Sequence, residues 1–285
     1  MKIIDAHVHY SDLFSFHECA KSMSDVDYTK KGFENESKEN NIIRSVCMGL
    51  GETTPGRFPD ENAKTPMLAN LTDKLPDGMA VCLGINPHTL NEHTLGQIEE
   101  LIKSGGSKAG GDIVGMKVYA GYYHYYVTDP IYDPIYKLAE KYDITIAVHT
   151  GETFSERGLL KYSHPLKLDE VAVAHPDLRI VACHMGVPWI FDAAELAIKN
   201  KNFYVDISGI LVGGKQFLDD KTANQLFLDR YRQALMFLDN YEKVLYGTDW
   251  PLVPMSAYMN FCKHIVPEEE YGKVFYENAK RVYKL

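Results

Sequence analysis

Residues 3–9 read IIDAHVH, a short apolar run that ends in two histidines separated by a single residue. Seven more stretches of the chain are built in a similar way: they are short and rich in valine, isoleucine and alanine, and most are closed by glycine, asparagine, aspartate or histidine. Such runs are typical of parallel strands that are buried on both faces. The eight predicted strands are Ile3–His9, Ile42–Gly49, Ala80–Asn86, Ile113–Tyr119, Ile144–His149, Arg179–His184, Asn202–Ile207 and Lys243–Asp249.

Helical patterns lie between these strands. Asp129–Lys141 and Pro165–Ala174 each carry proline near the first turn, where its fixed φ angle suits a helix, and Leu226–Leu238 and Pro267–Val282 predict the last two helices. A regular alternation of strand and helix predicts an α/β fold, a (β/α)8 TIM barrel that forms a single domain over residues 1–285. An open, doubly wound sheet is the alternative, because the strand number alone does not exclude it.

The composition is that of an ordinary globular protein, with 45% hydrophobic and 24% charged residues. The formal net charge is −9 and no dense run of lysine and arginine occurs, which argues against nucleic acid or an anionic membrane as a partner. The N-terminus has no apolar signal core, and no apolar run approaches the roughly 18 residues of a membrane helix. The five scattered cysteines suit buried thiols in a reducing compartment. We therefore expect a cytoplasmic protein.

Several histidines and one aspartate fall at the ends of predicted strands. His7 and His9 end the first strand, His149 ends the fifth, His184 ends the sixth, and Asp249 ends the eighth. The carboxyl ends of barrel strands converge on one mouth, and residues two apart on a strand point the same way. We predict that one divalent ion is held by His7, His9, His149 and Asp249. Nitrogen and oxygen ligands favour Zn²⁺, with Mn²⁺, Fe²⁺ or Co²⁺ as alternatives.

His184 is predicted to stay off the metal and to act as general acid or base toward a metal-activated water, because imidazole titrates near working pH. In this scheme the ion lowers the pKa of the water and polarises the carbonyl of the substrate. For any one of these residues, a hydrogen-bonded core position is the simpler interpretation. Five such residues at strand ends favour the metal site.

Four motifs that contain these residues occur in order along the chain. They are DAHVH at residues 5–9, VHTGE at 148–152, HMG at 184–186 and GTDWP at 247–251. With them the chain resembles the amidohydrolase superfamily, and more narrowly its amidohydrolase-related (amidohydrolase 2) branch, which includes aminocarboxymuconate-semialdehyde decarboxylase. Residues 164–186 and 277–282 are similar to that branch as well, so the resemblance extends over nearly the whole chain.

The resemblance implies a TIM-barrel, metal-dependent enzyme. It implies that His7, His9, His149 and Asp249 bind one divalent ion, usually zinc. It also implies that His184 is the acid/base residue, and that Asp249 shuttles a proton while it touches the metal, which makes Asp249 a catalytic residue too.

Lys117 ends the predicted fourth strand, and it has three interpretations. It binds a substrate carboxylate, it is a structural lysine, or it carries a carbamate that bridges a second metal, as in the binuclear relatives of this superfamily. Glu152 follows His149 by three residues and is predicted at the pocket edge, where it orients a ligand or simply begins a loop.

Residues 121–126, GYYHYY, form an unusually aromatic loop after the fourth strand. Loops at this end of a barrel select the substrate, and tyrosines offer flat apolar walls with a polar tip. A contact between two copies of the chain, and so a homodimer, is the other use of such a loop. The residues predicted to line the pocket are Tyr119, Tyr122, His164 and Trp250.

Three functions compete. The first is a metal-dependent hydrolase of a small organic molecule, such as a lactone, an amide or a related carboxylate derivative. The second is a lyase, a non-oxidative decarboxylase or hydratase, and the third is a barrel without catalysis, which the filled set of catalytic positions disfavours. The chain is compact and arginine is scarce near the strand ends, with Arg157 the nearest candidate. Decarboxylases of the resembling branch carry arginines there, so we favour the hydrolase.

Overall fold

Eight parallel strands form one sheet, in which each strand pairs with the next along the chain. The structure is a computed structural model that describes residues 1–106, 111–213 and 221–285. The predicted (β/α)8 TIM barrel is confirmed, and every predicted strand is present, most of them slightly shorter than predicted and the last one reduced to two residues. The strands are β1 (Ile3–Val8), β2 (Ile42–Met48), β3 (Met79–Ile85), β4 (Ile113–Val118), β5 (Thr145–His149), β6 (Ile180–Cys183), β7 (Phe203–Asp206) and β8 (Val244–Leu245).

Backbone hydrogen bonds between β1 and the segment that begins at β8 close the sheet into a barrel. Ala6 N donates to the carbonyl of Tyr246 over 2.9 Å, and His9 N donates to the carbonyl of Trp250 over 2.7 Å. Asp249 N donates to the carbonyl of His7 over 2.8 Å. A closed ring of strands excludes the open, doubly wound sheet, and it brings Asp249 beside the histidines of the first strand.

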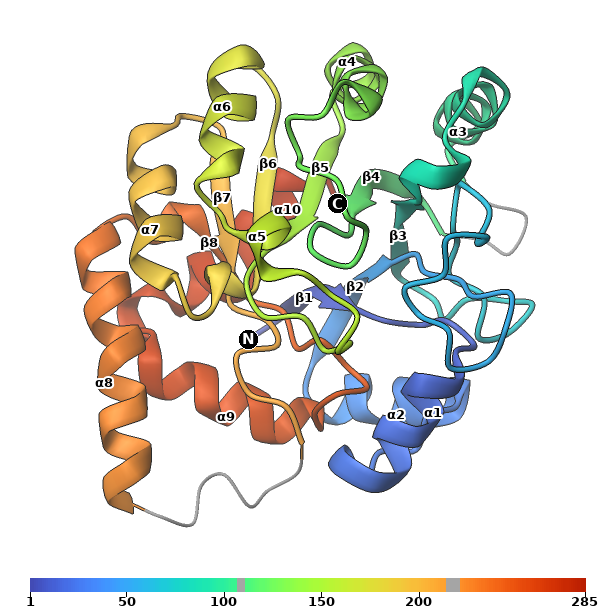
Figure 1. Ribbon diagram of the computed structural model, residues 1–285. Coiled ribbons are helices and arrows are strands. Elements are labelled where there is room, and N and C mark those ends of the chain that lie inside the picture. The colour runs from blue at the N-terminus through green and yellow to red at the C-terminus, as the bar shows by residue number, and fades with distance from the viewer. Residues whose placement is uncertain (107–110, 214–220) are drawn as a thin grey trace.

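Helices surround the sheet and pack their apolar faces on it (Figure 1). Within the described residues the α-helices are α1 (Phe14–Cys19), α2 (Lys30–Glu39), α3 (Glu92–Ser104), α4 (Asp133–Tyr142), α5 (Leu160–Ser163), α6 (Lys167–Ala174), α7 (Ile190–Lys199), α8 (Lys221–Leu238), α9 (Met255–Ile265) and α10 (Asn278–Val282). No helix of this part of the chain is both long enough and apolar enough to span a bilayer.

The four predicted helices are present with shifted boundaries. A short 3-10 turn at Pro130–Tyr132 leads into α4, α6 begins two residues after Pro165, and α8 includes the predicted Leu226–Leu238. The segment from Pro267 to Val282 is helical but irregular. It consists of a 3-10 turn (Glu268–Glu270), a π-helical turn (Lys273–Glu277) and α10.

The connection between β2 and β3 departs from the predicted strand–helix alternation. Residues 49–78 contain turns but no helix, which corrects the expectation of eight regular units. Four prolines lie in this stretch, and each lacks a backbone N–H and clashes with the preceding helical turn: they are Pro55, Pro59, Pro66 and Pro76. In Figure 1 this loop lies on the right of the barrel, between α3 and the pair α1 and α2.

The buried apolar residues form two clusters. The larger one lies between the sheet and the helices. The smaller one draws side chains from all eight strands, so it lies inside the barrel, together with residues of α10. Thr145 Oγ1 and Arg179 Nε donate to the carbonyl of Val282 over 2.6 and 3.0 Å, so the C-terminal segment covers the end of the barrel at which the strands begin. All five cysteines are buried and unpaired, as the sequence predicts.

Candidate active site

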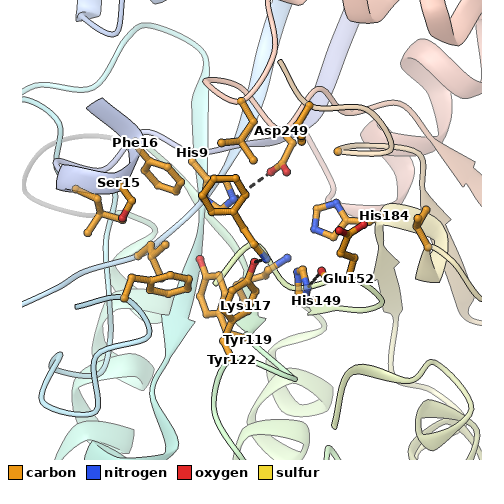
Figure 2. A pocket seen from close by; sticks show the side chains of 18 of the residues that line it. His9, Ser15, Phe16, Lys117, Tyr119, Tyr122, His149, Glu152, His184 and Asp249 are labelled. Atoms are coloured by element: carbon orange, nitrogen blue, oxygen red, sulfur yellow. Dashed lines mark hydrogen bonds and ion pairs between the residues drawn. The ribbon is translucent and has the colours of Figure 1, made fainter. Parts of the chain in front are cut away.

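The four predicted metal ligands all lie at the mouth formed by the strand carboxyl ends. His7 lies in β1, His9 follows that strand directly, His149 is the last residue of β5, and Asp249 follows β8. Asp249 Oδ1 is 3.4 Å from His7 Nε2 and 3.1 Å from His9 Nε2. Two ligand atoms that share one ion through bonds of about 2.0–2.1 Å are themselves about 3.0–3.4 Å apart. The spacing of these three residues therefore fits a common cation, and Figure 2 shows the contact between His9 and Asp249.

Two polar atoms at the centre of this cluster lack partners. His7 Nε2 and Asp249 Oδ1 are buried and make no hydrogen bond within the described residues. Because buried polar atoms normally have a partner, two orphaned atoms that face each other indicate a place for a cation. His7, His184 and Asp249 each offer a ligand atom, and these atoms lie within 4.8 Å of one another; the predicted ligands His9 and His149 are not part of this group. The donor set of imidazole nitrogen and carboxylate oxygen fits a divalent ion.

The hydrogen bonds of two of the histidines fix their tautomers. His7 Nδ1 lies 3.0 Å from Asp206 Oδ2, which accepts its proton and leaves Nε2 with a lone pair. His149 Nε2 donates to the carbonyl of Glu152 over 2.9 Å, so Nδ1 carries the lone pair. Burial lowers the pKa of His7 to about 3 and that of His149 well below its usual value, because it disfavours the charged ring. Both rings are thus held in the neutral form that binds a metal.

His184 presents one nitrogen to the pocket. Its Nδ1 lies 3.1 Å from the carbonyl oxygen of Ser208 and 3.0 Å from Ser208 Oγ. A carbonyl oxygen only accepts, so Nδ1 carries the proton and Nε2 is left as an acceptor. Burial lowers the pKa of His184 as well. The assignment of His184 as acid/base rather than metal ligand stays a prediction, since its ring is within reach of the ligand atoms.

Asp206 is a site residue that the sequence analysis missed. This carboxylate ends β7 and is fully buried. Its Oδ2 accepts from His7 Nδ1, and its Oδ1 accepts from Ser208 Oγ over 2.6 Å and from His184 N over 2.9 Å. Burial alone would raise the pKa of Asp206, but the neighbouring His7, His184 and Lys117 hold it well below its usual range. The signal was available, because Asp206 stands at a strand end just as His149 does.

The backbone is in the left-handed conformation at two site residues, one directly after β6 and one after β8. His184 has a φ of 62° and Asp249 a φ of 69°. Non-glycine residues rarely adopt this region, and such strain is concentrated at functional sites. Gly209 packs directly against both side chains. A Cβ atom there would lie 2.6 Å from Asp249 Oδ2 and 2.8 Å from His184 Nδ1, so the close approach requires glycine.

Lys117 is fully buried at the end of β4. Its Nζ donates to Cys183 Sγ over 2.9 Å and lies 5.5 Å from the centre of the Tyr119 ring. No carboxylate of the described residues lies within 4.0 Å of Nζ. Lys117 also lines the pocket. Lys117 is also close enough to Asp206 to lower the pKa of that carboxylate. Its three interpretations, as partner of a substrate carboxylate, as a structural lysine or as a bridging carbamate, stay predictions.

A pocket with a cavity volume of about 150 Å³ opens above the ligand cluster. Its floor is polar and its walls are apolar. The polar lining residues are His9, Ser15, Lys117, His149, Glu152, His184 and Asp249; the apolar and aromatic ones are Leu13, Phe16, Leu50, Phe58, Tyr119, Tyr122, Phe154, Val187, Ile210, Val212 and Leu252, with Gly209 between them. The predicted substrate contacts Lys117, Tyr119, Tyr122 and Glu152 are therefore brought to the pocket, and their roles toward a substrate stay predictions.

Two of the predicted wall residues are not in this pocket. Trp250 is fully buried behind the site, where it packs on Tyr28 and Phe33 and its indole N–H donates to Glu36 Oε1 over 3.0 Å. His164 stacks on Trp189, with ring centres 4.4 Å apart, and lies in a separate surface depression. Both predictions are corrected. A sequence shows that Trp250 adjoins Asp249, but it does not show to which side the chain turns after Asp249.

This chain is similar to a known protein family and to several solved structures. A protein-family model described as amidohydrolase matches residues 4–285. A search of the curated proteins finds no match. Among solved structures, the chain is similar to a probable 2-pyrone-4,6-dicarboxylic acid hydrolase from Acinetobacter baumannii, with 18% identity, 100% of each chain covered and a TM-score of 0.67.

Two decarboxylases are similar to the same degree. One is 2,6-dihydroxybenzoate decarboxylase from Rhizobium, with 14% identity, 100% of this chain and 99% of that chain covered, and a TM-score of 0.66. The other is a dihydroxybenzoic acid decarboxylase from a Polaromonas species with bound manganese, with 14% identity, 100% and 97% coverage, and a TM-score of 0.65. At these identities the likeness shows the fold.

Proposed function

The chain belongs to the amidohydrolase family of metal-dependent enzymes, and from that premise we propose that it is a hydrolase of a small lactone, amide or related carboxylate derivative. The observation behind this proposal is the orientation of the His184 ring. With Nδ1 bound to the carbonyl of Ser208, its Nε2 is an acceptor at the wall of the pocket. A neutral imidazole in this tautomer is suited to take a proton from water, which is the first requirement of hydrolysis.

The candidate ligands fit a divalent ion, and His7, His9, His149 and Asp249 would hold it. When bound, such an ion lowers the pKa of water and polarises a carbonyl group. The imidazole-rich donor set favours Zn²⁺, and the manganese in the Polaromonas decarboxylase makes Mn²⁺ the second ion to test.

The proton transfers of the reaction are carried out by side chains of the protein. His184 Nε2 takes the proton from water, and Ser208 and Asp206 hold the ring in place through Nδ1 and the backbone N–H. His184 then returns the proton to the leaving nitrogen or oxygen, so the residue ends the cycle as it began. The apolar walls exclude other water, which protects these proton transfers from the bulk solvent.

Decarboxylation is the second candidate, and a specific observation favours it. The walls around Lys117 are apolar, and a carboxylate moved from water into such a pocket is desolvated, which favours the loss of CO2. Two of the similar solved structures are decarboxylases by name. In that reaction His184 would have to be protonated, so that it could donate to carbon rather than accept from water.

An isotope experiment separates the two reactions. The protein is loaded with Zn²⁺ or Mn²⁺ and incubated with single-ring lactones, anilides and hydroxybenzoates, in heavy-oxygen water and in deuterium oxide. Hydrolysis places one heavy oxygen in the product carboxylate, whereas decarboxylation releases CO2 and places one deuterium on the product ring. We expect the first pattern, with the rate reduced by about 100-fold or more in His184→Gln. Release of CO2 with ring deuteration would replace the hydrolase by the decarboxylase.

A further inference from the structure

We propose that residues 152–162 form a lid over one side of the pocket, and that Arg157 is the positioning residue that holds this lid closed. The lid controls how a ligand reaches the floor of the pocket, where the candidate metal ligands and His184 lie. This role goes beyond the proposed function, because it is the same whether the reaction is hydrolysis or decarboxylation.

Residues 152–162 form a surface loop whose two ends are tied together (Figure 1, beside α5). Gly151 N donates to the carbonyl of Ser163 over 2.9 Å, and Ser163 Oγ donates to the carbonyl of Gly151 over 2.6 Å. A Cβ atom on Gly151 would lie 2.1 Å from the carbonyl oxygen of Val187, so this neck requires glycine. None of residues 152–162 is buried. Surface loops of this shape with few buried side chains are among the parts of a protein that open most readily.

The lid supplies part of the pocket wall. Glu152 and Phe154 line the pocket from the lid, and Phe58 lines it from the facing loop 49–78. Phe154 lies at the entrance, because its side chain is 50% exposed although it lines the pocket. Its backbone N–H donates to the hydroxyl of Tyr122 over 2.9 Å. Movement of the lid away from the loop 49–78 therefore opens the pocket from the side.

Two side chains of the lid attach it to the loop 49–78. Arg157 Nη2 donates to the carbonyls of Arg57 and Phe58, and we call these two hydrogen bonds the Arg157 latch. Ser155 Oγ donates to the carbonyl of Phe58 over 3.3 Å. Among the described residues, no backbone hydrogen bond joins the lid to the loop 49–78. Because hydrogen bonds from a charged donor are stronger than those from a hydroxyl, the Arg157 latch is the main attachment.

The Arg157 latch can be released without disturbing the rest of the fold. Arg157 is exposed, and no carboxylate of the described residues lies within 4.0 Å of its guanidinium nitrogens. Water therefore replaces the two carbonyls at little net cost when the latch opens. The opposite edge of the lid stays attached to the loop after β4, since Leu159 N donates to the carbonyl of Gly121 over 2.8 Å. An open lid admits a ligand, and a closed one excludes water from the proton transfers.

Hydrogen exchange tests the Arg157 latch without any ligand. The backbone amides of residues 152–162 are followed by mass spectrometry in the purified wild type and in Arg157→Ala. We expect these amides to exchange about tenfold faster in the variant, because the lid opens more often. In Arg157→Lys the increase should be smaller, since lysine keeps the charge but not the planar fork that reaches two carbonyls. Unchanged exchange in Arg157→Ala would overturn the latch.

Arg57→Ala is the matched control. This variant removes the same charge from the same rim of the pocket, and it keeps the backbone carbonyl that accepts from Arg157. The side chain of Arg57 is exposed and forms no ion pair within 4.0 Å among the described residues. We therefore expect Arg57→Ala to exchange like the wild type. An equal acceleration in Arg57→Ala and Arg157→Ala would show that the charge of the rim, and not the latch, holds the lid.

Chemical modification of His184 tests whether the lid controls access to the pocket. Diethyl pyrocarbonate acylates neutral imidazole, and the rate at His184 is measured by mass spectrometry in metal-loaded and in chelator-treated protein. We expect this rate to be about tenfold higher in Arg157→Ala than in the wild type and in Arg57→Ala. The exposed His93 should react equally fast in all three proteins. An equal rate at His184 in all three would overturn the control of access, whether or not the protein proves to be a hydrolase.

Discussion

Asp206 joins the two halves of the candidate active site. One of its carboxylate oxygens holds His7, a candidate metal ligand, and the other holds Ser208 and the backbone of His184. A single ionised group therefore fixes the tautomer of a ligand and the position of the candidate base. Such supporting partners of metal ligands normally matter about as much as the ligands themselves.

We predict that Asp206→Asn weakens metal binding by about 10–100-fold. Asparagine keeps one accepting oxygen, but its amide NH2 would face the N–H of His7 or the donors at His184 and Ser208, so one of these bonds is lost. The measurement is a competition for Zn²⁺ against a chromophoric chelator. Asp177→Asn, a change of the same kind at an exposed position, serves as the control, and equal affinity in both variants would contradict the prediction.

The metal content of the protein tests the ligand set directly. We expect about one equivalent of divalent ion per chain, lost in both His149→Ala and Asp249→Asn, as measured by elemental analysis of the purified protein. Nearly two equivalents would support a carbamate at Lys117 that bridges a second ion. Retention of the metal in both variants would show that these residues are not ligands.

At the residue scale the sequence predicts the candidate ligands because each is a rare residue type at a strand end. Asp206 follows the same rule, but nothing in the sequence reveals that it faces His7, 199 positions away. Ser208 is harder still, since its role depends on a carbonyl and a hydroxyl that turn toward His184. Contacts of this kind arise from the closed barrel and not from any local pattern.

At the scale of the elements, the ends of the strands are more predictable than what connects them. Parallel strands buried on both faces leave a continuous apolar run, so all eight are visible in the sequence. The connection from β2 to β3 is different, because its prolines remove a helix that the regular alternation would predict. The position of Trp250 also depends on a distant element, since its partner Glu36 lies on α2.

Glu36 links α2 to the segment after β8, and it makes the stability of the protein depend on pH. Its Oε1 accepts from the indole of Trp250 and its Oε2 accepts from Met255 N over 2.9 Å. Burial raises the pKa of Glu36, although these hydrogen bonds lower it in part. The folded protein therefore holds the carboxyl proton of Glu36 more tightly than the unfolded chain does. The stabilisation that follows is full below the unfolded pKa of about 4.3 and is lost as the pH rises through the folded pKa.

We predict that Glu36→Gln reduces the loss of stability between about pH 4 and about pH 7, because the variant has no proton to release there. The free energy of unfolding in urea at both pH values provides the measurement, and only the difference between them is compared. Glu39→Gln, an exposed position at the end of the same helix, should behave like the wild type. The same pH dependence in Glu36→Gln and the wild type would refute the assignment.

For the molecule as a whole, the C-terminal segment closes the end of the barrel at which the strands begin. Phe275 is fully buried, and its ring lies 4.7 Å from that of Tyr246, which follows β8. We predict that Phe275→Ala lowers the free energy of unfolding by about 3–5 kcal/mol, as expected for a buried phenylalanine that leaves a cavity. Denaturant unfolding measures the change. Phe237→Ala, at a side chain that is 49% exposed, should cost much less, and similar values for the two would contradict the prediction.

The loop from β2 to β3 is the part of this barrel that can change in evolution without disturbing the rest. It supplies Leu50 and Phe58 to the pocket wall, yet it contributes no helix to the outer ring. A lineage could lengthen, shorten or exchange this one segment and alter what enters the pocket, while the ring of helices and the ligand cluster kept their places. Related chains would then differ first in the substrates that they accept and only later in the reaction that they catalyse. The sequence differences that change the substrate would be concentrated in this loop.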